Sequence, residues 1–200
     1  MVRRLLDVTA AVCGLVVLLP VLIAVAIATR ATAGSGVLFR QRRLGIAGRP
    51  FELLKFRSMR HPLPGREGPE FDAERMTKTG RWLRALSIDE LPSLWNLLRG
   101  DISLVGPRPL PVQYWDRFLC DEYERFEVRP GITGLAQVNG RNAVDWPDRL
   151  ALDVEYVRNR TLRGDLRILV ATVPAVLGRS GIEHGAGVTM HELPAERSVG

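Results

Sequence analysis

Asp89 and Glu90 form a pair of adjacent carboxylates in the stretch SIDELP, which begins at Ser87. One interpretation is structural: Ser87 and Glu90 have the spacing of a capping box at a helix start. The other is chemical: an ionised aspartate can act as the nucleophile of phosphoryl transfer beside a metal ion. A helix starting at Ser87 would place Pro92 where its ring clashes with an earlier carbonyl. The sequence therefore favours a helix that begins at Pro92, with the pair just ahead of its positive end. A solvated surface pair is a third alternative.

Four basic residues accompany the pair. Arg84 lies five residues upstream of Asp89, and Lys55 is one of only two lysines in the chain. Arg108 stands between two prolines and Arg129 precedes one, so both backbones lose little entropy when an anion binds. Glycines at 131, 134 and 140 would let backbone N–H groups approach a phosphate. A surface salt bridge explains any one of these cations, but together they predict an anion pocket around two carboxylates.

The composition agrees with an anionic partner. The chain has 200 residues and a net charge of +6, carried almost wholly by arginine. Arginine binds phosphate through two parallel hydrogen bonds, although a codon bias toward arginine explains the excess equally well. The three histidines are scattered and the two cysteines are far apart. The sequence therefore indicates neither a disulfide framework nor a histidine-based metal or nucleophile site.

Residues 5–29 are almost wholly apolar after Asp7. A helix of about 24 residues reaches about 36 Å, which is enough to span a bilayer core. Pro20 interrupts the run, and arginines flank both of its ends, which a straight span does not explain. A helix bent at Pro20 that enters and leaves on one face explains both features. The residues alone put spanning slightly ahead of re-entrant.

The remaining elements follow from periodicity and from turn residues. In chain order we expect strands at 36–41 and 50–57, a loop at 60–72, helices at 73–86 and 92–99, a strand at 102–105, a helix at 110–126, turns at 129–142, helices at 146–160 and 165–178, and a loose tail from residue 181. The last helix is apolar enough either to lie on a membrane surface or to be buried in the core.

Five stretches of the sequence match motifs of a known protein family, in order and in spacing: FRQRRLG, KFRSM, SIDELPSLWNLLRGDISLVGPRP, RPGITGLAQVNGR, and LDVEYV followed by DLRIL. Through them nearly the whole chain resembles the bacterial sugar transferase family, the monotopic polyprenyl-phosphate phosphoglycosyl transferases. The stretch AQVNGRNAVDW is most similar to small stand-alone members that load a bacillosamine-type, N-acetylated amino sugar.

The resemblance implies a mostly helical α+β fold, a single compact domain with short strands, a β-hairpin and an N-terminal re-entrant membrane helix bent at Pro20. The resemblance thus favours a re-entrant helix over a spanning one, which reverses the preference drawn from the residues alone. Many members, however, have serine where this chain has Leu19. The implied organisation is a membrane helix at 1–30, a catalytic domain with interfacial helices at 31–185 and a flexible tail at 186–200.

The resemblance also implies an activity. Asp89 corresponds to the family's covalent nucleophile, with Mg²⁺ beside it. A UDP-sugar would give an aspartyl phospho-sugar and UMP, and a polyprenyl phosphate would then take the sugar phosphate. An ionised aspartate needs no base for this attack. Glu90 is expected to ligate the metal, to position the acceptor or to act as a base, and the sequence does not choose between these roles.

The candidate site residues follow. Asp89 and Glu90 are the catalytic and metal-binding candidates. The phosphate and nucleotide candidates are Lys55, Arg84, Arg108 and Arg129, and the sugar or uridine candidates are Gln137, Asn139 and Arg141. Asp165 lies in a family motif without an assigned role.

The expected partners are a UDP-sugar, a polyprenyl phosphate and membrane lipid, with a homodimer left open. The expected location is the bacterial inner membrane, with the active site on its cytoplasmic face. The alternative is a non-catalytic, basic, membrane-anchored adaptor that binds anionic lipid. Nucleic-acid binding is disfavoured because no recognised motif for it occurs.

Overall fold

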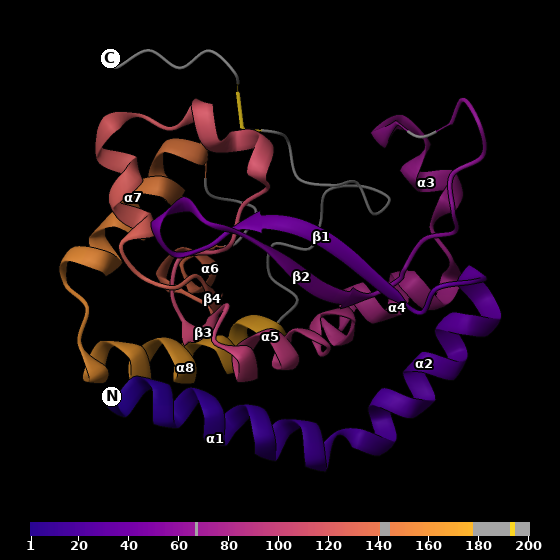
Figure 1. The fold of residues 1–200 in the computed structure, drawn as a ribbon, viewed down its shortest axis with the longest axis horizontal. Coiled ribbons are helices and arrows are strands. Elements are labelled where there is room, and N and C mark those ends of the chain that lie inside the picture. Colours follow the sequence, from indigo (N-terminus) through magenta and orange to yellow (C-terminus); the bar gives the residue numbers. More distant parts are fainter. Residues whose placement is uncertain (67, 141–144, 178–192, 195–200) are drawn as a thin grey trace.

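A computed structural model describes residues 1–66, 68–140, 145–177 and 193–194. Helices dominate, with two small two-stranded sheets among them (Figure 1). A mixed, mostly helical α+β architecture is therefore confirmed.

The apolar N-terminal segment forms two helices, α1 (Val2–Val17) and α2 (Leu19–Ala33), that meet at an angle of 64°. They run as one bent arm beneath the rest of the molecule (Figure 1). The break falls at Leu18, and Pro20 occupies the first turn of α2, where its missing N–H costs little. Among the described residues neither helix alone could cross a membrane, but the bent pair is long and apolar enough by length and composition.

Polar bonds tie α1 to the body of the protein. Asp7 is buried and accepts hydrogen bonds from the Ser103 hydroxyl at 3.0 Å and from the Leu104 N–H at 2.8 Å. Arg4 donates to the carbonyl oxygens of Leu97 and Leu98. The inner face of α1 is therefore part of the protein core, and Ala11 in its middle is fully buried.

A β-hairpin forms from β1 (Leu38–Leu44) and β2 (Pro50–Phe56), which pair antiparallel with Phe39 opposite Lys55 and Arg43 opposite Phe51. Side chains alternate across a sheet, so residues 41, 43, 51, 53 and 55 share one face. That face meets α5 (Ser93–Arg99), against which Leu53 packs in a core cluster with Leu97.

The predicted helix at 73–86 is two helices, α3 (Asp72–Arg75) and α4 (Lys78–Ala85). Thr77 separates them because its hydroxyl caps α4, accepting from the Gly80 N–H at 2.8 Å. A side chain at Gly80 would collide with the backbone of Ser58, so glycine allows α4 to approach the hairpin exit closely.

The second sheet joins two motifs far apart in sequence. Strands β3 (Ser103–Val105) and β4 (Gly131–Thr133) run parallel, and the N–H of Gly131 donates to the Pro107 carbonyl at 2.9 Å. An added Cβ at Gly131 would lie 2.1 Å from the Gly106 nitrogen. Gly131 is therefore required for close backbone packing, and its N–H does not serve the predicted phosphate cradle.

Three further helices, α6 (Leu135–Val138), α7 (Trp146–Arg158) and α8 (Leu162–Leu177), contribute to another core cluster. The predicted helix at 110–126 is instead two 3₁₀ segments, 112–117 and 120–126, whose aromatic rings pack edge to face. Of the predicted tail at 186–200, only residues 193 and 194 are described, and Leu193 is fully buried in this aromatic cluster.

Candidate active site

The carboxylate pair lies on a short 3₁₀ turn, Ile88–Glu90, between α4 and α5. Ser87 enters this turn with φ of 55°, in the left-handed region that a residue other than glycine seldom occupies. Its side chain makes no capping bond, and α5 begins at Ser93 with Pro92 as its N-cap. The capping-box alternative is thus wrong, and the expected position of the pair ahead of the helix is confirmed.

Two cations bind the carboxylate of Glu90. Lys55 donates from Nζ to Glu90 Oε1 at 2.6 Å, and Arg108 donates from Nη2 to the same oxygen at 3.1 Å. Burial would raise the pKa of Glu90, but these cations outweigh it and hold that pKa below its usual range. Burial in turn lowers the pKa of Lys55, which Glu90 opposes. Glu90 is therefore an anion at neutral pH, held in place from two sides.

Asp89 differs from its neighbour. It is 9% exposed, and no hydrogen bond or ion pair between described residues involves its carboxylate, whereas Lys55 and Arg108 both bind Glu90. Burial and the negative charge of Glu90 raise its pKa to about 6, against the opposing charges of Lys55, Arg84 and Arg108. At neutral pH Asp89 is therefore an ionised carboxylate. Several cations lie near it, but none of them binds its oxygens. Such an oxygen is suited to nucleophilic attack.

Arg84 is positioned from the hairpin side. Its Nε donates to the Ser58 hydroxyl at 2.9 Å, and burial lowers its pKa while Asp89 opposes that shift. Ser58 follows the end of β2, so the same hairpin that presents Lys55 also orients Arg84.

Arg43 also belongs to this cluster of charged residues, although it was not among the residues predicted for the site. It donates to the Pro109 carbonyl at 3.0 Å and to Gln41, and it lines a small cavity of about 20 Å³ with Lys55, Glu90 and Arg108. Burial and the nearby charge of Arg108 lower its pKa to about 10. Strand alternation could have revealed it, because Arg43 shares the hairpin face of Lys55.

The backbone of Arg108 has its own support. Arg125 donates from Nη2 to the Arg108 carbonyl at 2.8 Å and to Asp153 Oδ2 at 2.7 Å. Arg125 and Asp153 are each 2% exposed. This buried ion pair links α7 to the Gly106–Pro109 turn and so fixes one of the cations that face Glu90.

The other predicted residues lie elsewhere. Arg129 donates to the Gly100 carbonyl at 2.8 Å, at the far end of α5 from the carboxylate pair. Asn139 is exposed and donates to the Leu135 carbonyl, whereas both polar side-chain atoms of Gln137 are buried without a partner among the described residues. Arg141 falls outside the described residues.

Asp165 acquires a structural role. Arg3 of α1 donates to its Oδ2 at 2.6 Å, and Tyr156 of α7 lies 2.8 Å from its Oδ1. Burial and this hydrogen bond raise the pKa of Tyr156 to about 12. Asp165 thus joins α1, α7 and α8.

A divalent cation would find two adjacent carboxylates here, and no cluster of three or more acidic, histidine or cysteine ligands occurs within the described ranges. Mg²⁺ is commonly held by one or two carboxylates together with substrate phosphates and water. The unpartnered oxygens of Asp89 fit that donor set, and Glu90 would have to share its charge with Lys55 and Arg108.

The family follows from a comparison with family models: the Bacterial sugar transferase model matches residues 1–179. The chain belongs to this family. Among its relatives, an uncharacterised sugar transferase, EpsL, of Bacillus subtilis is 46% identical over 99% of this chain and 96% of its own length. The bacterial sugar transferases also include a UDP-glucose:undecaprenyl-phosphate glucose-1-phosphate transferase of Caulobacter vibrioides, 42% identical over 88% of this chain and 69% of its own.

A third member is an undecaprenyl-phosphate glucose phosphotransferase of Komagataeibacter xylinus, 40% identical over 86% of this chain but only 35% of its own length. These names confirm the predicted family. They do not confirm the predicted likeness to bacillosamine-type transferases, because two of the three names specify glucose and the third specifies no sugar.

Proposed function

We propose that this protein transfers a sugar 1-phosphate from a UDP-sugar to a polyprenyl phosphate, through a covalent intermediate on Asp89. The observation that carries the proposal is the contrast within the pair: Glu90 is bound by two cations, while Asp89 is buried and unbound among them. Relatives whose names state sugar phosphate transfer to undecaprenyl phosphate support it.

The reaction has two displacements at one phosphorus. A carboxylate oxygen of Asp89 attacks the sugar-bearing phosphorus of the donor, and the bond to the bridging oxygen breaks, so that UMP leaves with that oxygen. A phosphate oxygen of the polyprenyl phosphate then attacks the same phosphorus, and the bond to Asp89 breaks. The products are polyprenyl-diphospho-sugar and the original carboxylate. No proton is gained or lost when UMP leaves as a dianion and the polyprenyl phosphate attacks as a dianion.

The surrounding residues lower the repulsion between an anionic nucleophile and a diphosphate. Lys55, Arg84 and Arg108 supply positive charge within the site, and Arg43 lies beside them. Asp89 and Glu90 would hold Mg²⁺, which when bound screens the charge of the donor's phosphates. Gln137 and Asn139 remain candidates for sugar or uridine contacts.

The bent arm supports a monotopic, re-entrant attachment to the cytoplasmic face of the bacterial membrane. Its outer surface is apolar and exposed, with Leu5, Val17 and Ile27 each at least 65% exposed. Trp82 and Trp95 are also exposed, and tryptophan favours the membrane interface. Such an attachment would hold the carboxylates at the depth of a lipid-linked phosphate.

The donor sugar is a narrower proposal. The resemblance of AQVNGRNAVDW to amino-sugar transferases favours an N-acetylated sugar, whereas two relatives are named for glucose. A panel of UDP-sugars assayed in nanodiscs would rank them by UMP release.

The deciding experiment uses the full chain with labelled UDP-sugar and Mg²⁺ but no acceptor. We expect a phospho-sugar adduct on Asp89 by mass spectrometry, its release when polyprenyl phosphate is added, and loss of both in Asp89→Asn. Arg158→Gln, in an exposed ion pair with Glu124, is the matched control and should keep both. Turnover that never labels the protein would refute the covalent route, and absence of UMP release with every donor would favour the adaptor alternative.

A further inference from the structure

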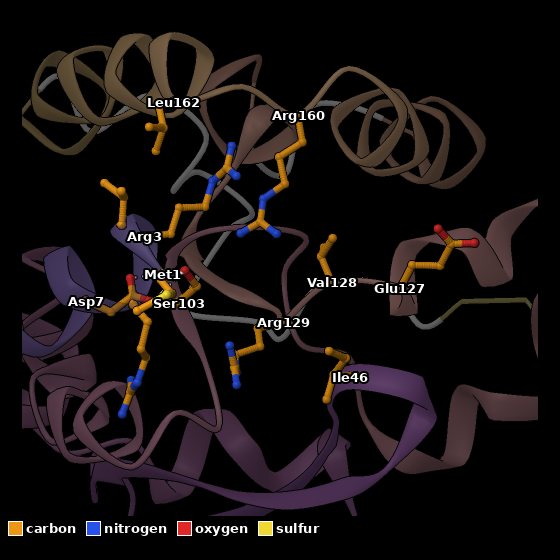
Figure 2. Close-up of a pocket in the computed structure, with 12 residues that line it drawn as sticks. Met1, Arg3, Asp7, Ile46, Ser103, Glu127, Val128, Arg129, Arg160 and Leu162 are labelled. Carbon is orange, nitrogen blue, oxygen red and sulfur yellow. Dashed lines mark hydrogen bonds between the residues drawn. The ribbon is translucent and has the colours of Figure 1, made fainter.

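A second cavity lies away from the carboxylate pair. It has a volume of about 450 Å³ and opens between the start of α1, the start of α8 and the segment around Arg129 (Figure 2). Arg4 and Arg129 bind carbonyl oxygens at the C-terminal end of α5, whereas Asp89 and Glu90 precede its N-terminal end. The seven residues of α5 separate the two sites by about 10 Å of helix.

The cavity is strongly basic. Its lining includes four arginines and the N-terminal residue: Arg3, Arg4, Arg129, Arg160 and Met1. The guanidinium groups of Arg3 and Arg160 both lie in the upper part of the cavity in Figure 2. Like charges in one cavity repel unless a counter-charge compensates them.

The carboxylates in and beside the cavity pair with only one of these arginines, Arg3, among the described residues. Asp7 is engaged by Ser103 and Leu104, and the Glu127 carboxylate points away from the arginines (Figure 2). Asp165 pairs with Arg3 through one nitrogen, Nε. Arg129 and Arg160 form no ion pair within the described part of the chain, and each uses only Nε in a hydrogen bond to an uncharged oxygen.

Apolar side chains at the starts of both helices line the cavity: Val2 on α1 is 56% exposed and Leu162 on α8 is 46% exposed. Further along the same helices, Leu6, Leu166 and Val170 are each more than half exposed. A free phosphate ion has no apolar group that could pack against these side chains. A phosphate that carries acyl chains would match both the charge and the apolar neighbours.

We propose that this cavity binds the headgroup phosphate of an anionic glycerophospholipid, at a site separate from the catalytic carboxylates. Arg129 and Arg160 supply the charge-assisted hydrogen bonds, and the acyl chains lie along α1 and α8. The proposal does not depend on the transfer reaction, so the lipid can be tested without a donor or an acceptor.

The test measures the melting temperature of the full chain in a non-ionic detergent. Short-chain dihexanoyl-phosphatidylglycerol is titrated against dihexanoyl-phosphatidylcholine and against inorganic phosphate. Because a ligand that binds only the folded state stabilises it, we expect a saturable rise with phosphatidylglycerol and a much smaller one with the other two. In Arg129→Gln/Arg160→Gln the half-maximal lipid concentration should increase at least tenfold.

The matched control is Arg99→Gln/Arg158→Gln, which removes two charges from exposed surface ion pairs and should titrate like the parent protein. Circular dichroism without lipid checks that each variant folds, and Arg160→Gln alone replaces the double variant if that one does not. An equal rise with phosphatidylcholine, an equal rise with inorganic phosphate, or an unchanged titration in the arginine variants would each overturn the proposal.

Discussion

At the scale of the residue, Asp89 combines two opposed requirements. Burial beside Glu90 makes its ionised form costly, while Lys55, Arg84 and Arg108 keep that form accessible at neutral pH. A nucleophile whose charge is only partly compensated reacts more readily than one that is fully paired, and the protein bears the cost in stability.

We therefore expect Asp89→Asn to stabilise the folded protein at pH 8. Raising the pKa from 3.8 to about 6 corresponds to an upper bound of about 3 kcal/mol on this gain. The folded protein binds a proton at this site more tightly than the unfolded chain, so the gain is full above pH 6 and disappears as the pH falls toward 4. Melting temperatures of both proteins from pH 4 to pH 8 measure it.

Glu90→Gln is the contrasting variant, because the pKa of Glu90 is lowered and its charge stabilises the fold. It should melt at a lower temperature than the parent protein at pH 8. A gain in stability with Asp89→Asn that persists at pH 4 would show that its burial is not the cause.

The sequence identified Asp89, Glu90, Lys55, Arg84 and Arg108, which the structure brings together. Their residue types and proline neighbours carry the signal. It did not identify Arg43 as part of the site, because its place depends on the register of a hairpin. Arg125, which binds the Arg108 carbonyl, likewise depends on its ion pair with Asp153 of α7, which spacing alone does not reveal.

At the scale of the element, the buried pair Arg125–Asp153 holds α7 to the turn that carries Arg108. Arg125 also lies over the rings of Phe118 and Phe126. The buried guanidinium thus contacts both aromatic rings and oxygen acceptors.

Burial raises the pKa of Asp153, against the charges of Arg125 and Arg149, so its ionised form is itself costly. We still expect Asp153→Asn to destabilise the protein, by at most about 3–5 kcal/mol, because it leaves the buried guanidinium of Arg125 without its counter-charge. Arg125→Met/Asp153→Leu, which removes both charges, should recover much of this loss. Thermal unfolding of the three proteins measures the effect. Breaking the exposed pair by Glu124→Gln should leave the melting temperature almost unchanged, because solvent screens that pair. A loss there equal to that of Asp153→Asn would contradict the role of burial.

Two helices were predicted closely: α5, which ends before Gly100, and α7, whose expected range of 146–160 has the right start and ends two residues late. Others were not, since the cap at Thr77 divides one predicted helix and the 112–126 region forms 3₁₀ turns around its aromatic rings. The parallel pairing of β3 with β4 joins residues 28 positions apart, which local patterns cannot specify.

At the scale of the whole molecule, the bent arm of α1 and α2 sets how the body would meet a membrane. Its apolar side chains face outward, while Asp7 and Thr29, one on each helix, are buried. Both helices therefore have an inner and an outer face, and the bend lets both inner faces contact the body.

We expect Pro20→Ala to reduce the bend, because the proline ring no longer clashes with the α1 carbonyl four residues earlier and the restored N–H can bond to that carbonyl. Spin labels at residues 5 and 31, in a variant lacking both native cysteines, are about 33 Å apart for a 64° bend and about 39 Å apart for a straight helix. Pulsed electron paramagnetic resonance measures that distance. Val21→Ala, an exposed neighbour, should leave it unchanged, and no change with Pro20→Ala would mean that packing alone sets the bend.

The buried bonds of Asp7 with Ser103 and Leu104 have a practical consequence for preparing this protein. Deleting the first 33 residues, a common route to a tractable fragment, would expose Leu97 and Ile102 and leave the backbone amide of Leu104 without its acceptor. A water-soluble version would instead keep the inward side chains of the arm and recode only the outward ones as polar residues.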